Sequence, residues 1–434
     1  MYVVIDSVAY TVLRNLTFAP QTDMTGNSVP INEISVDIVT DDNVSFGRYV
    51  ELYDDLDNLW CKYWITYAER TGEETVRIRG GSDISILDKV TLPATMYEND
   101  SVSSVLDETI VSNYVSGGLV ATLDYTLDSS YSNATITGFC PEQTARQRLQ
   151  WICFVLGAYV KTFFTDEITI LPIDSTLTLV PIDKIYWKPT VTYKDYVTAI
   201  AITGYVFTQG IPAFTDDYVT DGTTTWIVTK QTYSLANPSA PAGAPDNVIT
   251  IDGVYLVNST NVSGILSHLS QYYFKRTEVE LSVIDNAEYI PGDKLTVYAD
   301  EDLLFDGFVE SCEFAFGVQA KASVRLTAAE NRAGAKLTIK YMYGSTQLDM
   351  RVYTLPVGYS YTITNPFIDI YMNGHRYVFR PTTAAVVGTL TSAGATVTVN
   401  YAVALDLYQG VLHVISVDSI TEDTSGDYDV GVIA

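Results

Sequence analysis

Two stretches that lie far apart in this chain share one pattern of residues. Residues 47–60 read GRYVELYDDLDNLW, and residues 292–305, GDKLTVYADEDLLF, align with them without a gap. Each stretch has a glycine, an alternating apolar segment, an acidic turn and then an aromatic residue where the second strand begins. This pattern predicts a β-hairpin. The glycines and aromatic residues that match are Gly47 with Gly292, Tyr53 with Tyr298, and Trp60 with Phe305.

This likeness has two explanations. Hairpins in general favour glycine, aspartate and alternating apolar residues, so two unrelated hairpins can converge on one pattern. We favour a duplication, because the aromatic and aspartate positions also coincide. A trimer of chains with two such units presents six similar units around its axis and can stack on a sixfold ring. The six matched residues are therefore our candidates for the repeat and its interfaces.

Most of the remaining sequence predicts strands, and the 32 tyrosines agree with a sheet-rich fold. Helical periodicity appears at residues 99–115, with Asp100 or Ser101 as cap, and at 260–274. A third helix is expected within residues 138–157, enclosed on several sides, with Pro141 in its first turn and Gly157 at its end. Residues 82–89 predict one helical turn capped by Ser82, and residues 237–247 predict a loop.

The charge balance limits what the chain can bind. It has 25 Lys and Arg against 52 Asp and Glu, a formal net charge of −27. Binding to nucleic acid phosphates or to an anionic membrane needs clustered cations, so both are disfavoured. We interpret the acidity as repulsion between surfaces and solubility rather than as an acidic binding site. We expect no signal peptide and no membrane-spanning segment, and synthesis in a cytoplasm.

We find no pattern of residues that indicates catalysis. Four widely spaced cysteines form no C-x-x-C pair, which predicts buried free thiols (Cys61, Cys140, Cys153 and Cys312). The three histidines have no nucleophile or ligand pair beside them in the sequence (His268, His375 and His413). An acidic turn could hold calcium but lacks the EF-hand spacing, so we favour a solvated turn (Asp54, Asp55 and Asp57). Carboxylate pairs that could hydrolyse glycosides are numerous in any acidic chain. We predict no catalytic residue, cofactor or metal ligand.

The C-terminal part, from about residue 335, is poor in charge and rich in turn signals. Its most distinctive segment is residues 371–381, YMNGHRYVFRP, which predicts a hairpin with an Asn373-Gly374 turn. We interpret it as a plain hairpin. The alternative is that its tyrosines and histidine contact a neighbouring protein or a glycan.

The order of these elements resembles the hub proteins at the distal end of phage tails and related contractile injection machines, particularly hubs from phages of Gram-positive bacteria. The resemblance covers about residues 1–335. The motifs that carry it are VRIRGGSDISILDK (76–89), NDSVSSVLDETI (99–110), GFCPEQTARQRLQWICFVLGAYV with DEITILP (138–172) and YIPGDKLTVY (289–298).

The resemblance implies a mainly β fold with a small α/β insertion. Two tail-tube-like β-barrel or sandwich domains are expected, followed by a C-terminal all-β domain. The expected boundaries are 1–98 for the first tube-like domain, completed by 186–256, then 99–185 for the insertion, 257–335 for the second tube-like domain and 336–434 for the C-terminal domain.

The resemblance also implies a structural, non-enzymatic role in the virion, at the tail tip or baseplate, after assembly in the host cytoplasm. Such a hub is a homotrimeric ring of pseudo-sixfold symmetry. Its partners are the tail tube or a distal tail protein ring, a central spike or tip protein and the tape measure protein, with no membrane. DNA passes through without specific binding. The alternative function is a β-rich tail protein that binds carbohydrate or hydrolyses cell walls.

Overall fold

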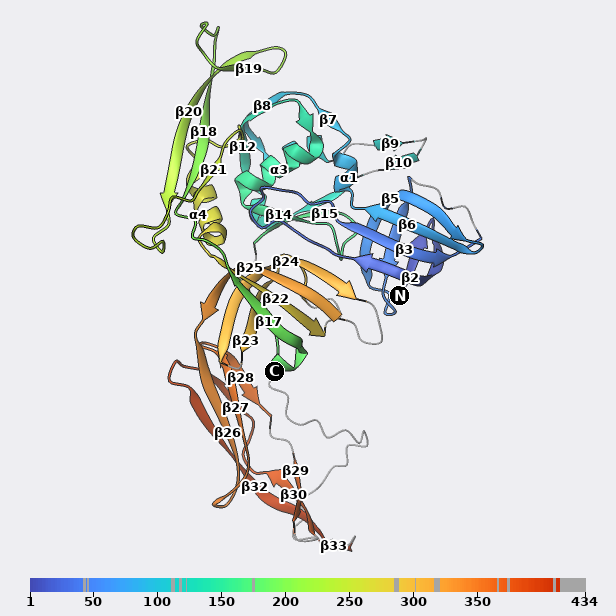
Figure 1. The fold of residues 1–434 in the computed structure, drawn as a ribbon, viewed down its shortest axis with the longest axis vertical. Coiled ribbons are helices and arrows are strands. Elements are labelled where there is room, and N and C mark those ends of the chain that lie inside the picture. The colour runs from blue at the N-terminus through green and yellow to red at the C-terminus, as the bar shows by residue number, and fades with distance from the viewer. Residues whose placement is uncertain are drawn as a thin grey trace. The chain divides into compact units, whose positions relative to one another are not determined.

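The computed structural model describes residues 1–41, 44, 47–110, 114–116, 119–121, 123–173, 176–284, 289–300, 302–315, 321–364, 367–372, 375–408 and 411–413. The chain divides into unit 1 (Met1–Ala299 and Phe305–Glu330) and unit 2 (Asp300–Leu304 and Asn331–Ala434). Strands dominate both units, and the helices are few and short (Figure 1). The predicted fold class, mainly β with barrel-like sheets, is confirmed.

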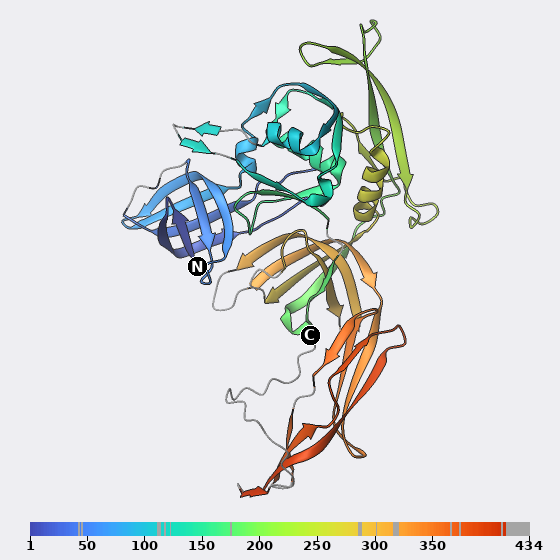
Figure 2. The same ribbon diagram turned by 180° about the vertical axis from the view of Figure 1, so that it is seen from behind.

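Unit 1 begins with a closed barrel. Its strands are β1 (Tyr2–Ile5), β2 (Val8–Phe18), β3 (Glu33–Val39), β4 (Tyr49–Tyr53), β5 (Leu59–Gly72) and β6 (Thr75–Gly81). They pair in the order β1-β4-β5-β6-β3-β2, all antiparallel, and pairing of β2 with β1 closes the ring. The barrel is visible from behind in Figure 2. Alternate side chains fill its interior, so that Val36, Val50 and Ile65 are fully buried.

A compact insertion follows the barrel. Its elements are α1 (Ile84–Leu87), β7 (Thr91–Leu92), β8 (Thr95–Ser101), α2 (Val102–Thr109), β9 (Tyr114–Ser116), β10 (Leu119–Ala121), β11 (Tyr125–Leu127), η1 (Ser129–Tyr131), β12 (Thr135–Cys140), β13 (Gln143–Thr144), α3 (Ala145–Leu156), β14 (Ala158–Lys161) and β15 (Ile168–Pro172). Side chains of α2 and α3 share one apolar core, and the predicted enclosure of α3 on several faces is confirmed. All four cysteines are buried free thiols, as predicted.

The helix ends follow local hydrogen bonds. Thr144 caps α3 in a reciprocal capping box with Gln147, so the prediction that Pro141 lies in the first turn is wrong. Gly157 ends α3 in the left-handed conformation (φ 65°), as predicted. Ser101 caps α2, also as predicted, whereas Ser82 does not cap α1, which has Asp83 at its N-cap and no side-chain cap bond.

A second β unit follows, and all but a few residues at its strand ends belong to unit 1. Its strands are β16 (Leu177–Leu179), β17 (Ile185–Tyr193, after the 3-10 turn η2, Ile182–Lys184), β22 (Thr277–Ile284), β23 (Lys294–Asp300), β24 (Leu303–Ala315) and β25 (Lys321–Arg332). They pair in the order β16-β23-β24-β25-β22-β17. This order repeats that of the barrel, strand for strand. Two features differ: β16 pairs with β23 in parallel, and no described pairing joins β16 to β17.

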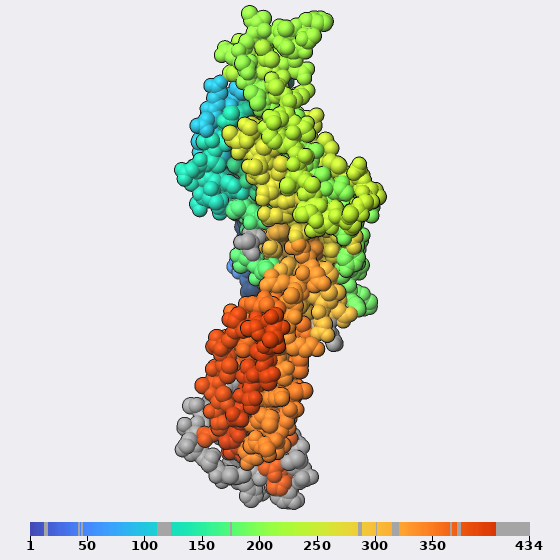
Figure 3. Space-filling model, turned by 90° about the vertical axis from the view of Figure 1, so that its left-hand side faces the viewer, coloured from blue at the N-terminus to red at the C-terminus, as the bar shows by residue number. Residues whose placement is uncertain are grey.

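Strands within residues 186–256, which we expected to complete the first β domain, pair elsewhere. The barrel closes without them, and β17 pairs with β22 of the second β unit. The others, β18 (Ala199–Gln209), β19 (Tyr218–Thr220), β20 (Thr225–Ala236) and β21 (Val248–Ile251), form a sheet of their own in the order β19-β20-β18-β21. The end of this long hairpin stands out from unit 1 in Figure 3. Residues 237–247 are the predicted loop, and α4 (Val262–Tyr273) is the helix predicted at residues 260–274.

Unit 2 is built of strands in its described part. They are β26 (Gly334–Tyr343), β27 (Thr346–Pro356), β28 (Ser360–Ile363), β29 (Ile368–Met372), β30 (His375–Pro381), β31 (Val386–Thr389), β32 (Ala395–Tyr408) and β33 (Val411–His413). The main sheet has the order β27-β26-β32-β30-β29, with β33 on β32, and β28 pairs with β31. Pairing of β29 with β30 confirms the predicted hairpin; its Asn373-Gly374 turn lies outside the described residues.

Candidate functional site

The two stretches that match in sequence occupy the same place in the two β units. Each runs from the start of one strand (β4 or β23) through the acidic turn into the next (β5 or β24). Gly47 and Gly292 both have positive φ, 82° and 101°, which glycine adopts without strain. A Cβ atom on Gly292 would lie 2.4 Å from the Tyr159 hydroxyl oxygen, so close packing also requires glycine there.

The same pair of backbone hydrogen bonds closes both hairpins. In the barrel, Gly47 N–H donates to the Ile65 carbonyl (3.1 Å) and Ile65 N–H donates to the Arg48 carbonyl (2.7 Å). In the second β unit, Gly292 N–H donates to Val309 (2.9 Å) and Val309 N–H donates to Asp293 (2.9 Å). Ile65 is therefore the structural equivalent of Val309. The ungapped sequence alignment is off by one residue at this point, because the barrel hairpin is one residue longer. A register shift between Leu52 and Tyr53 in the β4–β5 pair accounts for the extra residue.

Both β units also carry a cross-strand pair between an acid and an arginine. Asp37 lies opposite Arg77, and Glu280 lies opposite Arg325. The flanking residues match as well: Val36 and Ile38 in one unit correspond to Val279 and Leu281 in the other, and both pairs are buried. Our sequence comparison missed this second match, because the two strands of each pair are about 40 residues apart in the chain.

These two acid–arginine pairs differ in burial. Arg77 donates to both carboxylate oxygens of Asp37 (2.8 and 3.2 Å), and the Asp37 side chain is completely buried. Arg325 is 43% exposed and contacts Glu278 (3.0 Å) and Glu310 (3.5 Å). The barrel pair therefore holds a buried charge, whereas the second pair is part of a more solvated network.

The barrel and the second β unit meet edge to edge inside unit 1. The end of β2 runs antiparallel to β24, with Phe18 opposite Phe314 and Gln21 opposite Ser311. Thr22 N–H donates to the Glu310 carbonyl (2.9 Å), and Cys312 N–H donates to the Pro20 carbonyl (3.0 Å), in the same register. Aromatic side chains surround this junction (Phe18, Trp60, Phe164 and Phe314).

The aromatic residues of the predicted repeat are mostly internal. Trp60, Tyr298 and Phe305 are 5%, 7% and 2% exposed, which fits a framework role within the β units. Tyr53 is half-buried; its ring stacks on Tyr2 (5.4 Å), and its hydroxyl donates to Glu51 (3.0 Å). Burial, together with this hydrogen bond, raises the pKa of Tyr53 to about 12. As interface residues the six candidates stay a prediction.

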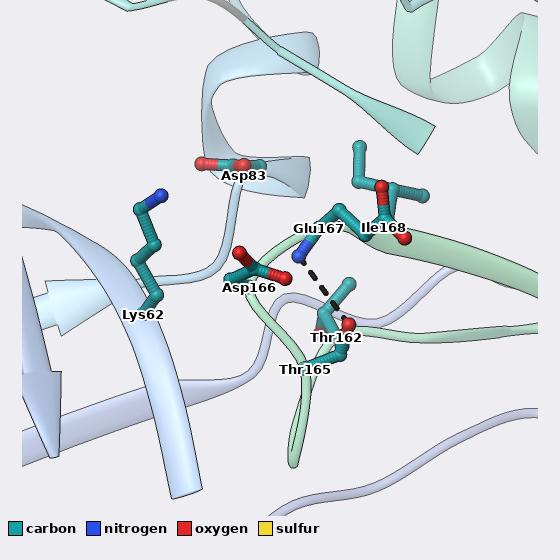
Figure 4. Close-up of a pocket in the computed structure, with 7 residues that line it drawn as sticks. All are labelled: Lys62, Asp83, Thr162, Thr165, Asp166, Glu167 and Ile168. Carbon is teal, nitrogen blue, oxygen red and sulfur yellow. Dashed lines mark hydrogen bonds between the residues drawn. The ribbon is translucent and has the colours of Figure 1, made fainter. Parts of the chain in front are cut away.

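A small polar hollow lies between the barrel and the insertion. Lys62 comes from β5, Asp83 from the start of α1, and Asp166 and Glu167 from the turn between β14 and β15 (Figure 4). Tyr49 donates a hydrogen bond to Asp83 (3.1 Å). Burial raises the pKa of Asp83 to about 6, although the Tyr49 hydrogen bond and the Lys62 charge act in the opposite direction.

Solved structures include proteins of similar fold, although no family model and no curated protein matches the sequence. The tail protein from Neisseria meningitidis MC58 superposes with a TM-score of 0.51 at 10% identity, over 75% of this chain and 95% of that chain. The chain has the fold of a tail protein. The predicted resemblance to phage tail proteins is thereby confirmed for the fold.

Two further solved structures superpose with slightly lower TM-scores. The 43 kDa tail protein of prophage MuSo2 from Shewanella oneidensis has a TM-score of 0.49 at 8% identity, over 75% of this chain and 97% of that one. The prophage tail protein gp18 from Listeria monocytogenes EGD-e has a TM-score of 0.48 at 10% identity, over 75% and 94%.

Within this tail-protein fold, the acidic turn of the barrel uses its oxygens internally. Asp54 accepts hydrogen bonds from the backbone of Leu56 (2.8 Å) and Asn58 (2.9 Å), and Asp57 accepts one from the Tyr2 hydroxyl (2.8 Å). Desolvation acts to raise the pKa of Asp54, but the hydrogen bonds lower it overall. Among the described residues, no group of three or more His, Cys, Asp or Glu side chains could hold a metal ion.

The side chains of two histidines are described, and each contacts a neighbouring group of the chain. His268 in α4 contacts the Met24 carbonyl through its Nε2 atom (2.9 Å), and burial lowers its pKa. His375 in unit 2 stacks on Tyr377, with ring centroids 5.4 Å apart. The side chain of His413 lies outside the described residues.

In the described part of the chain, no helix has the length and apolar character needed to cross a membrane.

Proposed function

We propose that this chain is a structural hub at the distal end of a phage tail. The observation that carries the proposal is the repeated strand order of the two β units, which are joined edge to edge within one chain. A subunit with two equivalent β units can act as an adaptor between threefold and sixfold symmetry. The tail-protein fold supports a role in a tail, and the rest of the proposal goes beyond it.

The proposed assembly is a homotrimer whose six β units form a pseudo-sixfold ring in the tail tip or baseplate. The tail tube or a distal tail protein ring stacks on one side, and a central spike or tip protein docks on the other. The tape measure protein and the genome pass through the channel. In this assembly the barrel and the second β unit are the tube-like domains, the insertion that we expected at residues 99–185 lies between them in the chain, and residues 336–434 form the C-terminal domain.

The net charge of −27 has a use in this assembly. A channel wall rich in carboxylates repels the DNA phosphates, so that the genome slides through without specific binding. Replacement of channel-facing Asp and Glu by Asn and Gln is expected to slow DNA delivery. Unchanged delivery would refute this part of the proposal and leave the ring intact.

The alternative function, a binder or hydrolase of carbohydrate, needs an accessible aromatic platform. The candidate is a hollow of about 330 Å³ on the outside of the barrel, beside Tyr49 and Trp64. Trp64 is only 4% exposed, and Lys62 lies over the Tyr49 ring (5.2 Å from its centroid). Burial of Trp64 and the position of Lys62 over the Tyr49 ring leave this hollow without an open aromatic platform, so the hollow itself does not support the alternative.

Mass measurement of the purified chain in solution tests the proposal, with electron microscopy of the same sample. A trimer that forms rings with six similar lobes is the expected result. A chain that stays monomeric at the highest concentration reached, and forms no rings, would refute the hub. Release of soluble fragments from cell walls by the purified chain would instead support the enzymatic alternative.

A further inference from the structure

The junction between β2 and β24 is a template for a second junction of the same kind, which one chain cannot form by itself. It joins residues 18–22, at the end of β2, to residues 310–314, near the end of β24. Each of these strands has an equivalent in the other β unit, since β2 matches β17 and β5 matches β24 in the common strand order. The equivalent junction would join β17 to β5.

The strand registers identify the equivalent residues. Phe18 lies opposite Ile34 in the β2–β3 pair, and Tyr193 lies opposite Thr277 in the β17–β22 pair. Ile34 corresponds to Thr277, because Asp37 and Glu280 follow them by three residues and occupy equivalent positions. Phe18 therefore corresponds to Tyr193.

The neighbouring sequences agree with this assignment. Residues 16–18 read LTF and residues 191–193 read VTY. Both strands also have two register shifts before these residues. On the other side of the junction, Ile65 corresponds to Val309. Phe314, five residues further along, therefore corresponds to Arg70.

Both members of the missing junction are accessible. The β4–β5 pairing ends at Trp64, followed by the backbone hydrogen bonds of Ile65 with Gly47 and Arg48, and no other described strand pairs with that edge of β5 beyond Ile65. Tyr67 is 42% exposed. Among the described strands, β17 is the last of its sheet, and Tyr193 is 57% exposed. A free edge of this kind is a ready site for another strand.

The segment after β17 is held extended and ready to pair. Arg276 lies over the rings of Tyr193 and Tyr196, 5.2 and 4.5 Å from their centroids. The two backbone groups that match those of the template are the Asp195 carbonyl and the Val197 N–H. Among the described residues, neither of these two groups has a hydrogen-bond partner.

We propose that residues 193–197 pair antiparallel with residues 66–70 of a second copy of this chain, with Tyr193 opposite Arg70. The inference rests on the proposed trimeric ring and names the strands that join each copy to the next. The template register then places Lys194 opposite Glu69, a complementary pair of charges, and Tyr196 opposite Tyr67. Each copy uses both edges, so three copies close a ring with six similar junctions.

A cysteine pair tests this register in the full-length chain. Glu69→Cys and Lys194→Cys change two exposed side chains that the proposal places directly opposite each other, within disulfide distance. The matched control combines Glu69→Cys with Asp195→Cys, which is one residue out of register and points to the other face of the strand. The four native cysteines are buried. Variants with only one added cysteine measure how much cross-linking the native cysteines contribute.

The expected result is a covalent dimer and trimer after mild oxidation of the Glu69→Cys/Lys194→Cys variant, reversed by reductant, at a yield at least about tenfold above the control. An oligomer that shows no such excess refutes the strand pairing and leaves the proposed ring standing. A chain that stays monomeric refutes both. Equal thermal unfolding of all the variants shows that the substitutions leave the fold intact.

Discussion

Replacement of Asp83 by asparagine is expected to stabilise unit 1 at neutral pH. The Asp83 side chain is 8% exposed and lies in the hollow of Figure 4, where burial raises its pKa from 3.8 to about 6. The folded protein therefore retains a proton that the unfolded chain releases between about pH 4 and pH 6. Folding free energy is lost as the pH rises through this window, and the penalty is complete above it.

The size of the effect follows from the pKa difference. A rise of about 2 units corresponds to about 3 kcal/mol at pH 7, at 1.36 kcal/mol per unit. At pH 5, where Asp83 is largely protonated in the folded protein, the same arithmetic leaves about 1.6 kcal/mol. Asparagine can still accept the hydrogen bond from Tyr49 and carries no charge. Asp83→Asn should therefore gain about 1.3 kcal/mol more at pH 7 than at pH 5.

Urea unfolding of both proteins at the two pH values, followed by tryptophan fluorescence, measures this difference. Asp166→Asn is the matched control, since it removes one carboxylate from an exposed side chain of the same hollow. A stabilisation of Asp83→Asn that is equal at pH 5 and pH 7, or a loss of stability at pH 7, would show that burial of this carboxylate does not govern its protonation.

Three other predictions concern stability. Arg77→Met removes the arginine that forms two hydrogen bonds with a fully buried carboxylate and should cost about 3 kcal/mol in urea unfolding. Arg325→Met, at the equivalent but more exposed position, should cost about 1 kcal/mol, and equal losses would contradict the difference in burial. Gly292→Ala places a side chain at positive φ and makes it clash with Tyr159, so it should lower the free energy of unfolding by at least about 2 kcal/mol. The control Gly253→Ala has φ 83° but open space around its Cβ position, and it should lower the free energy of unfolding by about 1 kcal/mol. Thr144→Ala removes the cap of α3 and should cost about 1 kcal/mol, and a neutral result would mean that packing alone holds the helix start.

Local interactions were accessible from the sequence. The hairpins of the repeat, the end of α3 at Gly157 and the cap of α2 at Ser101 each depend on residues a few positions apart, so pattern and capping rules suffice. The same rules misplaced the start of α3. Pro141 is acceptable in a first helical turn, but the reciprocal hydrogen bonds of Thr144 and Gln147 decide where the helix begins.

Only the tertiary structure decided which strands pair. An alternating pattern shows that a segment is a strand with one buried face, but it does not name the neighbouring strand. The sequence therefore could not show that β17 joins β22, that the barrel closes on itself, or that Asp37 and Arg77 match Glu280 and Arg325. The β17–β22 pairing and the two acid–arginine pairs join residues about 40 to 100 positions apart, and burial of apolar surface in the folded chain selects them.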